Sequence, residues 1–216
     1  VDNSLRFNSA DSANLDLTDP VGNNYYANFT FLMVGNLSNF TKIDTLRCLL
    51  KIENPVSRIE LSKILGLGEG TIRSILNILK KNNLLESNNK GHYLSEKGRN
   101  IIKKIKDNIN LKEITLNDPY PNKKKIALHL KSPDKLIKSY ILRDDAMKNG
   151  ADGALVFNFD KKLELYGSDY DRDFSDMEGM LDLGKDDLVI VAYADSYRLA
   201  EHGALAAAIE LNKDLK

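Results

Sequence analysis

The stretch LSKILGLGEGTIRSILNILKKNNLL, residues 61–85, decides the fold of the first half of this chain. Apolar residues recur at helical spacing on both sides of the break Gly66-Leu67-Gly68. Gly66 is suited to end the first helix because glycine adopts the left-handed conformation without strain. The second helix is expected to begin near Glu69 and to end near Asn82. The sequence therefore predicts two helices joined by a tight turn.

Another helix comes before this pair. Apolar residues in the segment 40–50 recur at helical spacing, and Pro55 lies just beyond its end. Ser57 can cap the helix that follows, with Glu60 completing a capping box. The buried stripe of this capped helix is expected to consist of Ile59, Leu61, Ile64 and Leu65.

A β-hairpin and a further helix complete the module. The residues Asn-Asn-Lys-Gly at 88–91 separate two short apolar segments, which predicts a hairpin over residues 84–94. A helix is expected to begin at Ser95. We assign the module to residues 29–107. Residues 1–28 are rich in Asn, Asp and Ser without a regular apolar pattern, so we expect a flexible tail there.

The second half of the chain has a different pattern. Residues 108–122 contain Asp-Pro-Tyr-Pro and are interpreted as a linker. Residues 123–216 are expected to form an α+β sandwich domain in the order β-α-β-β-β-α. Its predicted elements are strands at 125–130, 154–159, 162–166 and 188–193, a helix from Pro133 to Asn149, and a helix from Ser196 to about Asn212.

Charge is distributed unevenly along the chain. The total is zero, with 31 basic and 31 acidic residues. Residues 37–110, however, hold 14 lysines and arginines against 7 acidic residues, a balance of +7, whereas residues 1–36 and 111–216 carry −3 and −4. A basic module of this size can attract a polyanion, although the same excess also suits a merely solvated helical surface.

The cellular compartment is predicted from cysteine usage and hydropathy. The single cysteine, Cys48, lies in an apolar helical run, which indicates a reduced and buried thiol. No stretch has the roughly 18 uninterrupted apolar residues of a spanning helix, and the N-terminus has no secretory pattern. We therefore expect a soluble protein of the cytoplasm that does not enter a membrane.

The polar side of the segment 69–82 carries side chains that suit a DNA groove. Arginine can pair with a guanine edge and asparagine with an adenine edge, which applies to Arg73 and Asn77. Hydroxyl groups and lysines suit phosphates, and a small residue permits close approach. The candidate DNA contacts of this helix are Gly70, Thr71, Arg73, Ser74, Asn77, Lys80 and Lys81.

The order LSKILGLGEGTIRSILNILKKNNLLE, followed by GHYLSEKG, resembles the winged helix-turn-helix of bacterial and archaeal transcription regulators. The resemblance spans residues 40–106 and implies a recognition helix at 69–82 in the major groove. It also implies a wing at 84–94, with Lys90 and His92 as contacts to the backbone or minor groove. Gly68 stands where such regulators often have a capping serine.

The second half has its own resemblance. The segments GADGALVF and ADSYRLAEHGALAAAIEL are similar to the uncharacterised C-terminal domain of a set of archaeal winged-helix proteins. This resemblance supports the architecture and implies no particular ligand.

Other candidate sites lie in the second half. Asp195 and Ser196 follow an apolar strand and begin a helix, a position that suits either a ligand site or a plain helix cap. The acidic segment 169–178 lacks the glycine and the final glutamate of a calcium loop, so it is interpreted as a solvated loop. His92, His129 and His202 show no metal-site spacing, and the chain has no nucleophile elbow, phosphate loop or thiol pair. We expect no enzyme activity, metal or cofactor.

Together these patterns predict a transcription regulator that binds double-stranded DNA. The second domain is expected to form a homodimer, to sense a small-molecule effector, or both. Dimerisation follows from geometry, because one recognition helix reads few base pairs while a two-fold pair reaches half-sites about 34 Å apart. The alternatives are a winged-helix module that binds only proteins and, less favoured, a small enzyme that uses the second domain.

Overall fold

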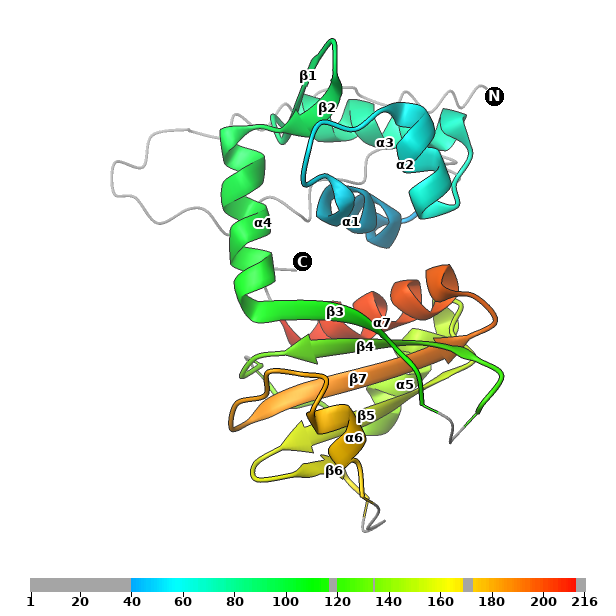
Figure 1. The fold of residues 1–216 in the computed structure, drawn as a ribbon, viewed down its shortest axis with the longest axis vertical. Helices are drawn as coiled ribbons and strands as arrows, with labels where there is room; N and C mark the ends of the chain where they lie inside the picture. Colours follow the sequence, from blue (N-terminus) through cyan, green and yellow to red (C-terminus); the bar gives the residue numbers. More distant parts are fainter. Residues whose placement is uncertain (1–39, 117–119, 134, 169–172, 213–216) are drawn as a thin grey trace, which may run out of the picture.

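The helices and strands form two parts that are stacked along the long axis of the molecule (Figure 1). The computed structural model describes residues 40–116, 120–133, 135–168 and 173–212. A helical part with a small hairpin comes first, and a five-stranded antiparallel sheet with helices follows. The fold is therefore mixed α and β, as predicted. The predicted tail lies outside the described residues.

The helical part contains the elements expected from the sequence. These are α1 (Lys42–Lys51), α2 (Arg58–Leu65), α3 (Glu69–Lys81), β1 (Leu85–Asn88), β2 (Gly91–Leu94) and α4 (Glu96–Asn108). Gly66 follows α2 in the left-handed conformation, with a φ of 64°. Ser57 Oγ accepts the backbone N–H of Glu60, which confirms the predicted cap of α2, but within the described residues no bond from Ser57 N–H to the Glu60 side chain completes the predicted capping box. Gly68 precedes α3 and makes no side-chain cap.

The predicted buried stripe of α2 is only half correct. Leu61 and Leu65 are fully buried, whereas 53% of Ile59 and 48% of Ile64 is exposed. Successive residues of a helix are rotated by about 100°. Leu61 and Leu65 therefore share the side that packs on α3, while Ile59 turns to the opposite side and Ile64 to the flank. Helix α2 contacts its neighbours along too narrow a side to cover all four residues.

The second part is an antiparallel sheet with helices on both faces. Its elements are β3 (Ile109–Ile114), β4 (Lys124–Leu130), α5 (Ser139–Lys148), β5 (Gly153–Phe159), β6 (Leu163–Leu165), α6 (Ser175–Glu178), β7 (Asp187–Ala194) and α7 (Tyr197–Leu211). The strand order is β3-β4-β7-β5-β6. Leu128 and Ile190 belong to the core under α5 and α7, whereas Ala127 and Val189 belong to a second core that includes Met177 of α6. The alternation of strand residues thus fills both faces.

The predicted linker, residues 108–122, is wrong over much of its length. Helix α4 runs directly into β3, which pairs with β4 in a register that places Ile109 opposite Leu130. Ile109 and Ile114 are buried, but polar residues between them hide the strand pattern in the sequence. The order is therefore β-β-α-β-β-α-β-α, with one more strand and one more short helix than predicted.

The helix expected from Pro133 begins later than predicted. Helix α5 starts at Ser139. Ile137 packs against the main core before the helix begins, so the approach to the helix is an irregular segment. Among the described residues, no helix combines the length and apolar character that crossing a membrane requires.

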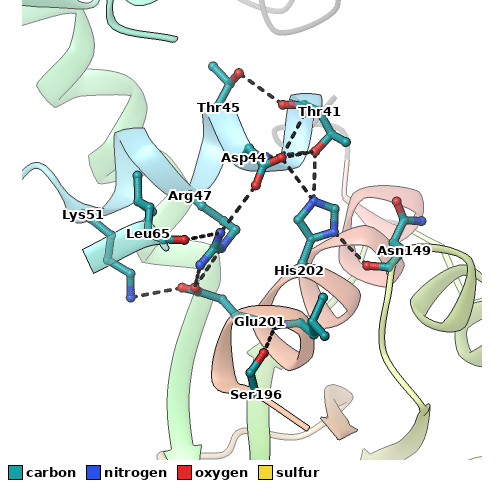
Figure 2. Close-up of polar contacts among 11 residues, drawn as sticks. Thr41, Asp44, Thr45, Arg47, Lys51, Leu65, Asn149, Ser196, Glu201 and His202 are labelled. Carbon is teal, nitrogen blue, oxygen red and sulfur yellow. Dashed lines mark hydrogen bonds and ion pairs between the residues drawn. The ribbon is translucent and has the colours of Figure 1, made fainter. Parts of the chain in front are cut away.

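Helix α1 joins the two parts by packing on α7. Arg47 of α1 is buried, and its Nε donates a hydrogen bond of 2.9 Å to Oε2 of Glu201 on α7. Lys51 Nζ lies 3.0 Å from the other oxygen of that carboxylate. Thr41 Oγ1 and His202 Nε2 lie 2.9 Å apart beside this pair (Figure 2). Because α1 faces the sheet part, α3 and the hairpin lie on the far side of the helical part (Figure 1).

Because of Asp44, the stability of this junction is expected to change with pH in the acidic range. Burial raises the pKa of Asp44, but hydrogen bonds from His202 and Thr41 outweigh it and hold that pKa well below its usual range. A carboxylate of this kind stabilises the fold above its unfolded pKa, near 3.9, and loses that contribution as the pH falls through the folded pKa. We expect the free energy of unfolding to fall below about pH 4, and to fall less in Asp44→Asn. Denaturant unfolding at a series of pH values measures this, and equal slopes in the two proteins would contradict it.

Cys48 is buried in α1, as predicted for a reduced thiol. Burial raises the pKa of Cys48 to about 12, an effect that the nearby Arg47 charge opposes only in part. The thiol is therefore protonated at neutral pH and contributes packing rather than chemistry.

Candidate nucleic-acid interface

Helix α3 has one apolar and one polar side. Its buried residues are Ile72, Ile75, Leu76 and Leu79. Its opposite side, here called the α3 polar face, consists of the predicted contacts Gly70, Thr71, Arg73, Ser74, Asn77, Lys80 and Lys81. Thr71 and Lys80 are half-buried and the other five residues are exposed. The helical spacing thus brings all seven predicted contacts of α3 to one accessible surface.

Most side chains of the α3 polar face have free donors. The side chains of Arg73, Asn77 and Lys81 make no hydrogen bond or ion pair with any other residue in the described parts of the chain. Ser74 differs, because its hydroxyl donates to the carbonyl of Gly70 over 3.2 Å. Ser74 is therefore the least available of the predicted polar contacts. At Gly70 a Cβ would meet nothing within 4 Å, so the backbone there faces open space.

The hairpin places Lys90 and His92 differently. Lys90 is exposed in the turn, where its N–H donates to Oδ1 of Asn88 over 2.8 Å. His92 lies at the base of the hairpin and exchanges two backbone hydrogen bonds with Val56. Its Nδ1 lies 2.7 Å from Ser87 Oγ. Lys90 thus occupies the outer position predicted for a backbone contact, whereas His92 holds the hairpin against the segment before α2.

His92 lies close to two positive charges. Burial lowers the pKa of His92, and the charges of Lys80 and Arg58 lower it further. Its imidazole is therefore neutral at pH 7 and can act as a hydrogen-bonding group rather than as a cation. This cluster joins α2, α3 and β2 into one positive surface.

Arg58 is a basic residue of this surface that sequence reasoning missed. It is the first residue of α2, and its guanidinium lies 3.1 Å from a carboxylate oxygen of Glu69 at the start of α3. Its Nε is buried without a hydrogen-bond partner. The sequence did contain a signal for Arg58, because it follows the N-cap residue Ser57. The start of α2 lies beside the start of α3, so a cation next to this cap also reaches α3.

Asp195 and Ser196 have structural roles. Ser196 Oγ accepts the N–H of Leu199, so Ser196 is the cap of α7. Asp195 is highly exposed and pairs with Lys123 over 2.7 Å. Neither residue lines the pockets described between the two parts. Ser196 thus forms the helix cap that the sequence offered as one alternative, and a ligand site at these two residues stays a prediction.

The remaining candidates are not gathered into a reactive centre. His129 is buried on β4, and its Nε2 lies 2.6 Å from Oδ2 of Asp187, whose oxygens also accept the N–H groups of Ser132 and Gly184. The described residues contain no group of three or more side chains that could hold a metal ion. Part of the acidic segment, residues 169–172, lies outside the described residues.

Comparisons with known proteins agree with this two-part architecture. Residues 42–100 match the model of the PH0730-like N-terminal domain, and residues 121–211 match a domain of unknown function, DUF4443. Among solved structures, the chain is similar to the hypothetical protein PH0730 from Pyrococcus horikoshii OT3, with 27% identity and a TM-score of 0.68. The match covers 80% of this chain and 92% of that one. A search of curated proteins finds no match.

Proposed function

We propose that the helical part is a winged helix-turn-helix that binds double-stranded DNA, and that the protein regulates transcription in the cytoplasm. Helix α3 enters the major groove, and the hairpin β1–β2 is the wing, with Lys90 on the phosphate backbone. The single observation that carries the proposal is the α3 polar face, which is accessible and rich in unpaired donors. The proposal includes no catalytic activity and no cofactor.

Two further observations support this proposal. The face lies away from the acidic sheet part, because α1 rather than α3 packs on α7 (Figure 1). In addition, Lys80 and Arg58, which is paired with Glu69, add cations beside the residues that would read bases. Phosphate contacts from such flanking cations fix the register of a recognition helix.

Duplex binding and its salt dependence test the proposal. A random duplex pool is selected on the full chain, and the affinity for the recovered sequence is measured between 50 and 300 mM salt. With about three to five phosphate contacts, log K is expected to fall with log salt with a slope of roughly −3 to −5. Recovery of no preferred sequence, with affinity no higher than that of an acidic control protein, would favour the alternative of a protein-interaction module. The exposed Ile59 and Ile64 are the observation that favours that alternative.

We also propose that the protein binds DNA as a homodimer through its second domain. Selected sequences are then expected to contain inverted half-sites whose centres are one helical turn, about 34 Å, apart. Light scattering with and without the duplex measures the assembly. A monomer in both conditions, with a single asymmetric site, would remove dimerisation while leaving DNA binding intact.

A further inference from the structure

A pocket lies between the two parts of the chain, and none of its lining residues belongs to α3. Its volume is about 310 Å³, at the lower end of the range for small-molecule sites. Five elements supply its walls: α1, the end of α2, the edge strand β3, β4 and the start of α7. The side chains that matter most are Lys63, Ile64, Leu111, Tyr197 and Arg198.

Positive charge dominates this interdomain pocket. Five basic and two acidic residues line it. At its inner end, Glu201 is already paired with Arg47 and Lys51. Lys112 also lines it, but it alternates with Leu111 to the other face of β3, where its Nζ meets the carbonyl of Met180. The charged side chains that remain for the pocket are Lys63 and Arg198 against Glu113. The pocket therefore has an uncompensated positive charge that favours an anion.

Two cationic side chains of the pocket have hydrogen-bond donors without a partner. The side chains of Lys63 and Arg198 make no hydrogen bond or ion pair with any residue in the described ranges. Lys112 Nζ instead donates to the carbonyl of Met180 over 2.9 Å, beside the second core on the other face of the sheet. The aliphatic stem of Arg198 lies over the end of α2, where a Cβ on Gly66 would be 3.3 Å from Arg198 Cδ. Arg198 thus reaches from the sheet part to the helical part.

Apolar groups line the rest of the pocket. Ile64 is 48% exposed although it lies on a helix of the core, and it faces this space. Leu111 and the ring of Tyr197 are half-buried and also line it. An occupant that covers these three side chains removes apolar surface from water while its anionic end meets the cations.

We propose that the interdomain pocket binds a phosphate monoester with a compact organic group. The guanidinium of Arg198 offers a planar pair of donors that matches phosphate oxygens, and Lys63 adds a point charge from the opposite wall. The organic group lies against Ile64, Leu111 and Tyr197. Because the walls belong to both parts of the chain, a bound ester fixes their relative position. Its use as an effector of DNA binding rests on the proposed function, whereas binding itself does not.

Calorimetry on the full chain without DNA tests this site. Adenosine 5′-monophosphate and ribose 5-phosphate are the probes, and adenosine and ribose are their uncharged counterparts. At least one ester is expected to bind with a Kd of about 1 mM or tighter, and its uncharged counterpart at least about tenfold more weakly. The double variant Arg198→Gln/Lys63→Gln should weaken ester binding at least about tenfold. Both replaced side chains are exposed, so the fold is expected to persist, which circular dichroism checks.

Two matched variants locate the binding. Lys148→Gln/Lys185→Gln removes the same charge from exposed positions outside the pocket and should change ester affinity by less than about twofold. Arg73→Gln/Lys81→Gln on the α3 polar face should also leave it unchanged. The proposal is overturned if neither ester binds at 10 mM, if the pocket variant binds like the wild type, or if the α3 variant abolishes binding. Because no DNA is present, none of these outcomes bears on the proposed DNA binding.

Discussion

Replacing Arg73, Lys80 and Lys81 together with glutamine is expected to weaken binding to a selected duplex at least about 100-fold. A bidentate contact of arginine to guanine contributes about 1–3 kcal/mol of discrimination, and each lysine lost from a phosphate removes counterion release. The three side chains lie on one side of α3 and none is fully buried, so the variant should fold. Fluorescence anisotropy at fixed salt measures the affinity.

A matched triple variant separates position from total charge. Lys148, Lys161 and Lys185 are exposed lysines of the sheet part, and their replacement with glutamine removes the same three charges. Its affinity for the duplex should stay within about threefold of the wild type, because charges beyond a Debye length of about 10 Å are screened. Equal losses in the two triple variants would mean that net charge, and not the α3 polar face, drives binding.

Single variants distinguish base reading from backbone contact. Arg73→Ala should relax the preference at one base position while other positions keep theirs. Lys81→Ala should weaken all sequences about equally and reduce the salt slope by about one unit. If Arg73→Ala leaves the preference unchanged at every position, Arg73 does not read a base.

Local pattern predicts the elements of the helical part well. The helices, the hairpin and the positions of Gly66 and Ser57 follow from apolar spacing and capping, which depend on neighbours along the chain. The same spacing places the seven predicted contacts on one side of α3. These features need no knowledge of distant residues, so a single sequence contains the information for them.

Features that depend on distant residues were missed. Strand β3 has only weak alternation of its own and is defined by pairing with β4. Ile59 and Ile64 fit a helical stripe, yet their burial depends on whether a neighbour covers that side of α2. Arg47 resembles any surface cation of an amphipathic helix, although its partner Glu201 lies 154 residues away. Tertiary contacts determine the pairing of β3, the exposure of Ile59 and Ile64, and the burial of Arg47. The neighbouring residues in the sequence give no sign of these contacts.

The buried pair of Arg47 and Glu201 should dominate the stability of the junction between the two parts. Both side chains are almost fully inaccessible, and their closest charged atoms are 2.8 Å apart. Removing Arg47 leaves the buried carboxylate of Glu201 with only the partly exposed Lys51, and loss of one partner of a buried ion pair typically costs about 3–5 kcal/mol. Arg47→Ala is therefore expected to lower the free energy of unfolding by about 3 kcal/mol or more, as measured by denaturant unfolding. Figure 2 shows that Arg47 also lies near the carbonyl of Leu65 at the end of α2, so its loss should loosen the helical part as well.

Two comparison variants test whether the poorly compensated charge of Glu201 causes the loss of stability in Arg47→Ala. Arg47→Met/Glu201→Leu removes both charges and keeps side-chain volume, so it should be more stable than Arg47→Ala, even though more of the native contact is gone. Lys51→Met removes a second cation from the same carboxylate, but Lys51 is 40% exposed, so its loss should cost less than about 1 kcal/mol. If the double variant is less stable than Arg47→Ala, the ion pair itself supplies net stability and the desolvation argument fails. If Lys51→Met costs as much as Arg47→Ala, the carboxylate of Glu201 needs both cations, and burial of Arg47 is not what sets the strength of the junction.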